Sequence, residues 1–156
     1  MPRPPVRRAA GGRFELRLSR GEREALRTVP AQIRELLEVE NPSSDPGVAR
    51  LFPPAYPDDP LENLDFERLA TDELMRGRLL ALDTMERTID ATALSEDELL
   101  AWMNVVNDAR LILGTRIGVT EEMTERDFAD EPEATTFQLY GYLSWLLESI
   151  VRALSA

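Results

Sequence analysis

The side chains best suited to chemistry in this sequence gather in one stretch, WMNVVNDARLILGTRIGVTEE at residues 102–122. Asn104 and Asn107 can donate and accept hydrogen bonds. Asp108 is a carboxylate that could act as a general acid or base, and Arg110 is a permanent cation that could bind an anion. The stretch therefore has two interpretations: a catalytic or ligand-binding site, or a core helix that carries polar residues.

Helical geometry places Arg110 on the apolar side of this stretch. Successive residues of an α-helix are rotated by about 100°, so Arg110 falls on the same arc as Trp102. An unpaired buried guanidinium is costly, and the favoured interpretation is a structural pair with a core-facing acid, for which Asp83 and Glu86 are the candidates. The alternative is an anion-binding arginine that lines a pocket.

Asn104, Asn107 and Asp108 fall on the other side of the same predicted helix. Asparagine has a poor helix propensity, so some compensating contact usually accompanies it inside a helix. The favoured interpretation is a structural or solvated edge, and the alternative is a hydrogen-bonding surface that contacts a partner. These three residues, together with Trp102, Arg110 and Trp145, are the candidates for a structural or interaction role.

Three residue types are missing, and their absence excludes several kinds of chemistry from this chain. The sequence has no cysteine, no histidine and no lysine, since all 18 basic residues are arginine. Thiol nucleophiles, thiol redox switches and disulfides are excluded, as are Ser-His-Asp catalysis and sites built on imidazole. Schiff-base and phosphate-binding lysines are excluded too. Only carboxylates and tyrosines remain for acid–base chemistry.

Metal and cofactor sites are not expected. Di-iron sites in helical bundles use a Glu-x-x-His motif, which needs the missing histidine. Residues 121–133 are rich in acids, but their spacing is not that of an EF-hand, so a solvated acidic turn is favoured over a calcium or magnesium site. The sequence also lacks a glycine-rich phosphate loop. We therefore predict no catalytic, cofactor-binding or metal-binding residue, and a protein that is not an enzyme.

The charge is strongly acidic and unevenly distributed. The net charge is −11, although residues 1–13 contain four arginines and no acid. An acidic body repels nucleic-acid phosphates, so direct nucleic-acid binding by the folded part is not expected. Residues 1–12 are rich in Pro, Arg and Gly and predict a disordered basic tail. Neither a secretory leader nor a membrane-spanning run is recognisable, so a cytoplasmic location is expected.

Helix start signals and apolar periodicity predict four main helices in a single domain over residues 13–154. Ser19 with Glu22, and Ser95 with Glu98, have the spacing of capping boxes. They predict helices from Ser19 to about Val39, with Pro30 at a kink or irregular turn, and from Ser95 to about Thr115. A third pattern runs from residue 63 to about residue 91. Gly77 in its middle suggests close approach of another helix.

The fourth helix is expected from about residue 134 to about residue 153. Its apolar stripe is wide enough to be buried on more than one side, and it includes Trp145. This width predicts either burial within the chain or a homodimer through the C-terminal helix. Between the first and third helices, a proline-rich stretch predicts a loop anchored by Phe52 and Tyr56, with a recognition surface as the alternative.

The fold class predicted is therefore mainly α, a compact bundle of four main helices plus short helices. The alternating pattern RFELRL also predicts a strand. We expect a short two-stranded β-ribbon that pairs Phe14–Leu18 with Ile117–Val119.

Three stretches in this order resemble one actinobacterial family labelled as a domain of unknown function. They are RLFPPAYPDD, LSEDELLAWMNVVNDARLILGTRIGVTEE and YGYLSWLLESIVRAL. The family includes an actinomycete oxidative-stress regulator, and its members are typically encoded near the ClpS protease adaptor. The resemblance implies a regulator that acts with a sigma factor on transcription through a closely spaced cysteine pair. This chain has no cysteine, so no redox residue carries over.

The function expected is a non-catalytic regulatory domain that binds a protein partner. The resemblance implies a transcription-associated stress regulator that contacts a sigma factor or polymerase, without thiol sensing in this chain. The alternative is a small acidic ligand-binding domain or enzyme that uses Arg110 and carboxylates. A pocket converging on Arg110 would favour the alternative, and an exposed apolar patch would favour the interaction domain.

Overall fold

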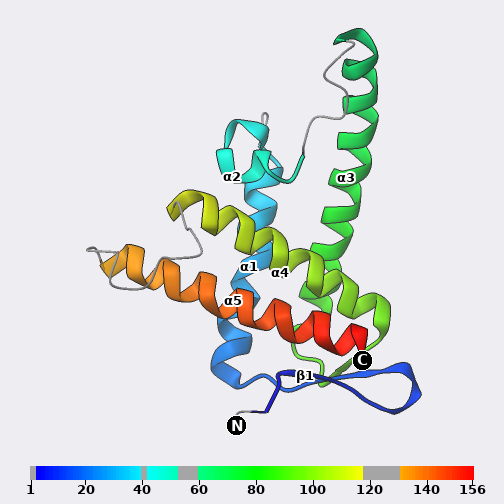
Figure 1. Ribbon diagram of the computed structural model, residues 1–156, viewed down its shortest axis with the longest axis vertical. Coiled ribbons are helices and arrows are strands. Elements are labelled where there is room, and N and C mark those ends of the chain that lie inside the picture. Colours follow the sequence, from blue (N-terminus) through cyan, green and yellow to red (C-terminus); the bar gives the residue numbers. More distant parts are fainter. Residues whose placement is uncertain (1–2, 40–41, 53–59, 118–130) are drawn as a thin grey trace.

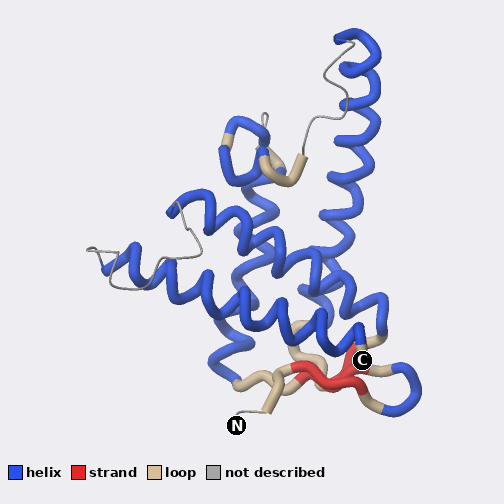
Figure 2. Tube along the Cα trace, in the orientation of Figure 1, coloured by secondary structure: helices blue, strands red, loops and turns tan. Residues whose placement is uncertain are grey.

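Four long helices form most of the molecule in the computed structural model, which describes residues 3–39, 42–52, 60–117 and 131–156 (Figure 1). Short helices and a small sheet complete it (Figure 2). The long helices are α1 (Arg20–Leu37), α3 (Pro60–Thr88), α4 (Glu96–Ile117) and α5 (Glu131–Ser155). The short ones are η1 (Ala10–Gly12), η2 (Pro42–Ser44) and α2 (Pro46–Ala49). The predicted fold class is confirmed.

Both predicted capping boxes are present and fix where two helices begin. Before α1, the Glu22 amide donates to Ser19 Oγ at 3.1 Å and the Ser19 amide donates to a Glu22 carboxylate oxygen at 3.0 Å. Ser95 and Glu98 make the same reciprocal pair before α4, at 3.2 and 2.8 Å. These bonds satisfy amides that the first helical turn would otherwise leave unpaired. Pro30 is buried within α1, which continues through it as one helix.

The sheet has three antiparallel strands in the order β1 (Val6–Arg8), β2 (Phe14–Leu16) and β3 (Ala93–Leu94). Phe14 of β2 lies opposite Arg8 of β1 and opposite Leu94 of β3. The prediction of a strand at Phe14 is confirmed, but the predicted partner is wrong, because Ile117 belongs to α4. Residues 118–119 of the predicted ribbon lie outside the described residues.

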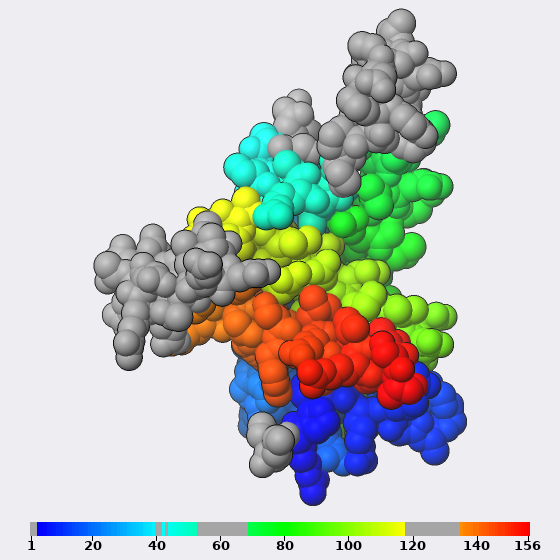
Figure 3. All heavy atoms as spheres, in the orientation of Figure 1, coloured from blue at the N-terminus to red at the C-terminus, as the bar shows by residue number. Residues whose placement is uncertain are grey.

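The N-terminal residues are another correction, because part of the predicted disordered tail is strand β1. Val6 is buried, and its amide donates a hydrogen bond to Ser149 Oγ of α5 at 3.3 Å. Figure 3 shows this hairpin covering the underside of α5. A single apolar residue among arginines and prolines gives little strand signal, and the contact with α5 is too distant in sequence to foresee.

The core lies where α4 packs between α3 and α5. Trp102 and Leu99 of α4 are fully buried, as are Leu143, Leu146 and Ile150 of α5. The wide apolar stripe of α5 is therefore largely used inside the chain. Trp145 and Val151 stay 44% and 45% exposed.

Helix α3 extends beyond the helices that pack against its C-terminal half (Figure 1). Leu69 and Leu80 are 69% and 60% exposed. The expectation of a close helix contact at Gly77 is wrong, because a Cβ atom built there meets no atom within 4 Å. The close approach occurs at Gly114 instead, where such an atom would lie 3.0 Å from the Tyr140 ring.

The predicted anchoring role of Tyr56 lies outside the described residues. So does most of the acidic segment of residues 121–133. Within the described ranges, no group of three or more acidic residues is placed to hold a metal ion. None of the helices seen in these ranges is long and apolar enough to cross a membrane.

Candidate interaction site between helices α3 and α4

An ion pair between half-buried Arg78 and buried Asp108 joins α3 to α4. Arg78 Nε lies 3.1 Å from Asp108 Oδ2, and Arg78 Nη2 donates to Asp108 Oδ1 at 3.4 Å. The guanidinium also lies over the ring of Phe52, 5.3 Å from its centre. Phe52 is half-buried, as expected of a loop anchor. The aromatic ring and the carboxylate together position Arg78 against α4.

Burial dominates the electrostatics of Asp108, whose residue is 6% exposed. Loss of solvent raises the pKa of Asp108 to about 6, although the charge and hydrogen bond of Arg78 act in the opposite direction. A carboxyl with this pKa takes up a proton a little below neutral pH. The net charge of the Arg78–Asp108 pair therefore changes when the solution becomes mildly acidic.

The Arg78–Asp108 pair lies at an open groove of about 640 Å³ between the two helices. Helix α3 contributes Leu74 and Gly77, and helix α4 contributes Asn104 and Asn107. Because Gly77 has no side chain and no neighbouring atom within 4 Å of its ideal Cβ position, the groove is open above it. The remaining lining residues are Ala70 and Glu73.

The structure thus brings Asn104, Asn107 and Asp108 together on one groove, while their environments differ. Asn104 is exposed, Asn107 is half-buried and Asp108 is buried. Asn107 Oδ1 accepts a hydrogen bond from Arg110 at 3.1 Å. Among the residues that the structure describes, none is hydrogen-bonded to the Asn104 side chain, so Asn104 is the member of this set whose amide is available to an incoming molecule.

Arg110 does not line this groove. Besides Asn107, it donates to the Tyr140 hydroxyl of α5 at 3.5 Å, and its Nε is buried without a partner among the described residues. The predicted acid partners, Asp83 and Glu86, instead both form ion pairs with Arg34 of α1. The predicted pairing is wrong because α3 presents these two acids to α1, whereas α4 packs on another side of α3.

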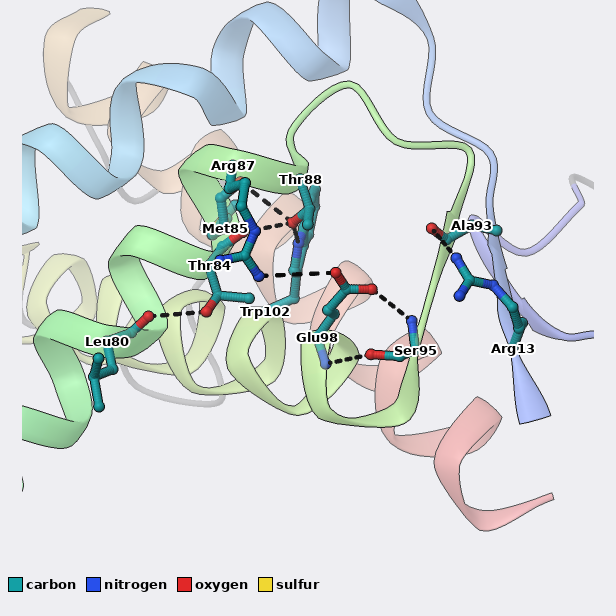
Figure 4. A network of polar contacts seen from close by, with 10 residues as sticks. All are labelled: Arg13, Leu80, Thr84, Met85, Arg87, Thr88, Ala93, Ser95, Glu98 and Trp102. Atoms are coloured by element: carbon teal, nitrogen blue, oxygen red, sulfur yellow. Dashed lines mark hydrogen bonds and ion pairs between the residues drawn. The ribbon is translucent and has the colours of Figure 1, made fainter.

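Trp102 lies in the core, away from the groove. Its Nε1 donates to Thr88 Oγ1 at 2.8 Å, and Thr88 Oγ1 donates to the Thr84 carbonyl at 2.7 Å (Figure 4). Beside it, Arg87 lies 3.9 Å from Glu98 of the capping box. Trp102 therefore ties the end of α3 to the start of α4 and is structural.

Trp145 lies on α5, apart from the other candidates. Its ring packs at a tilt against Tyr142, with 5.9 Å between ring centres. The Tyr142 hydroxyl donates to Glu22 Oε2 at 2.7 Å, which links α5 to the capping box of α1. Trp145 borders a separate groove beneath α5, together with Arg7, Arg8 and Arg152.

Arg78 is the central residue that sequence reasoning missed. It falls on the same helical arc as Leu74, Ala81 and Met85, so the criterion that singled out Arg110 applied equally to Arg78. Applied to both helices, it would have identified half-buried Arg78 as a second arginine that needs an acidic partner.

The groove is suited to recognition of another molecule. Its two charged residues that could do chemistry, Asp108 and Arg78, form an ion pair with each other. Asn107 accepts a hydrogen bond from Arg110. What remains accessible is the apolar side chain of Leu74, the amide of Asn104 and the carboxylate of Glu73. Such a mixture of apolar and hydrogen-bonding groups is typical of a surface that binds a protein segment.

Comparisons with known proteins place the chain in a family. It is similar to the protein called "Putative oxidative stress regulator AosR" of Mycobacterium leprae, with 30% identity over 129 residues that cover 72% of this chain and 59% of that protein. It is also similar to "Oxidative stress regulator AosR" of Mycobacterium tuberculosis, with 29% identity over 127 residues that cover 70% of this chain and 58% of that protein.

The chain thus spans less than two thirds of the length of these relatives. No solved structure matches it. Residues 3–154 match the family described as "Domain of unknown function (DUF2017)". Since that match covers nearly the whole chain, the protein belongs to the DUF2017 family.

Proposed function

We propose that this protein is a non-catalytic regulatory domain that acts by binding a protein partner in the α3–α4 groove. The partner class that we infer is the transcription machinery, a sigma factor or RNA polymerase. The names of the similar mycobacterial proteins, which call them oxidative stress regulators, support a regulatory role. Because the chain has no cysteine, it would not itself sense oxidants through a thiol.

The observation that carries the proposal is the accessible edge of the groove. Leu74 is 40% exposed, Gly77 leaves open space, and Asn104 presents an amide beside them. A partner helix or loop could bury an apolar side chain against Leu74 and hydrogen-bond to Asn104. The acidic character of the chain favours a basic partner segment over nucleic acid.

The test is to block the groove on its α4 side. Asn104→Arg adds bulk and positive charge in the groove, and arginine has a better helix propensity than asparagine, so the fold should persist. The matched control is Leu100→Arg, one helical turn earlier on α4, at a residue that does not line the groove. Wild-type and both variant proteins would be tested for binding to purified host sigma factors and polymerase core by interferometry.

We expect wild type and Leu100→Arg to bind one of these proteins and Asn104→Arg to bind it roughly tenfold more weakly, a loss of about 1.4 kcal/mol. Equal binding by all three proteins would remove the groove from the proposal. Absence of binding to every sigma factor and to polymerase would remove the transcription machinery as the partner class.

The alternative, an acidic ligand-binding domain or enzyme that uses Arg110, has weaker support. The Arg110 side chain is held between Asn107 and Tyr140 and does not line the α3–α4 groove. Arg110→Met distinguishes the two functions. The regulatory function requires that this variant still bind the partner, whereas loss of binding without loss of stability would favour Arg110 as a ligand-binding residue.

A further inference from the structure

The exposed side of α3 carries two large apolar side chains, which is unusual for a helix surface that faces only water. Leu69 and Leu80 are 69% and 60% exposed. They are eleven residues apart, which is about 16 Å along the axis and within about 20° on the helical wheel. Glu73 and Arg76 lie between them on the same face, and both are exposed. Neither charge has an ion-pair partner in the part of the chain that the structure describes.

The spacing of these four residues matches a helix–helix seam. Positions 69, 73, 76 and 80 are separated by four, three and four residues, which is the spacing of core positions in paired helices. We call this set (Leu69, Glu73, Arg76 and Leu80) the α3 seam. Its ends are apolar and its middle holds one acid and one base.

The α3 seam is complementary to itself when two copies run antiparallel. With a two-fold axis between residues 74 and 75, each Leu69 faces Leu80 of the second copy. Each Glu73 then faces Arg76 of the second copy. A two-fold interface uses the same patch twice, so one arrangement forms two apolar contacts and two ion pairs at once. No other register satisfies all four residues.

The neighbouring helices leave this face open. Helix α1 contacts one flank of α3, where Arg34 pairs with Asp83 and Glu86. Helix α4 contacts another flank, where Asp108 pairs with Arg78. The α3 seam lies on the arc between these flanks, directed away from the buried Met85 side. A second α3 can therefore approach without displacing either helix.

We propose that the α3 seam is a homodimer interface in which two α3 helices pair antiparallel. The seam is short and contains two charged layers, so the dimer is weak and forms in a concentration-dependent manner. The α3 seam adjoins the α3–α4 groove and shares Glu73 with it. Leu69, Arg76 and Leu80 do not line the groove, so variants at Arg76 and Leu80 test the dimer separately from the proposed function. It differs from a dimer through α5, for which exposed Trp145 would be the anchor.

The test uses charge reversal on purified protein in sedimentation equilibrium experiments at low salt. Glu73→Arg places two bases in each seam, and Arg76→Glu places two acids there. Each variant alone should associate roughly tenfold more weakly than wild type, because both ion pairs become repulsive. An equimolar mixture of the two variants should recover association as a mixed dimer, since each base then faces an acid.

Two further variants separate this interface from others. Leu80→Asp places an acid in both apolar contacts and should abolish association. Val151→Asp alters a partly exposed apolar residue on α5 and should leave association intact. Circular dichroism would verify that every variant retains its helices. Failure of the two charge variants to associate on mixing, or a wild-type protein that stays monomeric at high micromolar concentration, overturns the proposal. Dimerisation lost in Trp145→Ala but kept in Leu80→Asp overturns it in favour of α5.

Discussion

At the scale of single residues, the Arg78–Asp108 pair has the clearest functional consequence, because its charge state depends on pH. Burial raises the pKa of Asp108 to about 6, above the value of 3.8 for an unburied aspartate. A group whose pKa is raised on folding contributes stability that is fully present below its unfolded pKa. That contribution is lost as the pH rises through the folded pKa.

Asp108→Asn should therefore change the pH dependence of stability. The asparagine does not titrate, so the free energy of unfolding of wild type should fall relative to that of the variant by roughly 1 kcal/mol between pH 5 and 7.5. Urea denaturation of both proteins across this range measures the difference. A constant difference across the range would mean that Asp108 titrates outside it and that Arg78 outweighs burial.

Tyr142 gives a second prediction, with the opposite pH dependence. Burial raises the pKa of Glu22, but hydrogen bonds from Tyr142 and Ser19 outweigh it and hold the pKa below its ordinary value. The stability from ionised Glu22 is thus present above about pH 4.5 and lost as the pH falls through the lowered pKa. Tyr142→Phe should lower the free energy of unfolding at pH 7 by about 1 kcal/mol.

The same substitution should raise the pKa of Glu22, which NMR titration of its carboxyl carbon would follow. Ser155→Ala is a suitable control, because the Ser155 hydroxyl donates to the Val151 carbonyl within its own helix and so links no two elements. If Tyr142→Phe were no more destabilising than this control, the link from α5 to the α1 cap would be unimportant for stability.

At this scale, sequence patterns predict contacts between residues close in the chain but not contacts between distant residues. The Ser19 and Ser95 capping boxes could be predicted because both partners lie within four residues. The contact of Arg110 with Tyr140 could not, because it depends on how α5 packs against α4. Arg23 is a similar case: it donates to the carbonyls of Ile89 and Ala91 beyond the end of α3, more than sixty residues away.

At the scale of elements, α3 packs against other helices along its C-terminal half and borders an open groove at Gly77. Gly77→Ala should raise the free energy of unfolding by roughly 0.5–1 kcal/mol, because alanine favours a helix interior and its methyl group would meet no atom. Thermal denaturation measures this change.

Gly47→Ala provides the contrasting control. A Cβ atom at Gly47 would lie 3.1 Å from the Ile112 backbone of α4, which cannot move aside easily. This variant should be destabilised, so a gain at position 77 and a loss at position 47 would together show that local space decides the effect. A loss of stability in Gly77→Ala would contradict the open groove.

Apolar periodicity predicted the four long helices well because each buries a continuous stripe, as in Leu143, Leu146 and Ile150 of α5. It did not predict strand β1, where Val6 is the one buried apolar side chain among exposed arginines. Periodicity also did not separate buried leucines of α3 from exposed ones such as Leu69 and Leu80. That distinction depends on how far α3 extends past its neighbours.

At the scale of the whole molecule, the acidic body and the arginine-rich hairpin form two regions of opposite charge. The hairpin arginines are largely engaged within the chain: Arg7 pairs with Glu15, and Arg8 donates to the Leu154 carbonyl. The basic start of the sequence therefore helps to join the sheet to α5. This explains why a segment with the composition of a disordered tail is ordered.

The two tryptophans of the chain lie in opposite environments, and this gives the protein two built-in fluorescence reporters. The indole of Trp102 is fully buried and hydrogen-bonded to Thr88, so its emission should be blue-shifted and protected from acrylamide. Trp145 is 44% exposed, so acrylamide should quench it selectively in the native state. Unfolding can thus be followed through one residue, and occupancy of the surface beneath α5 through the other, without adding a label.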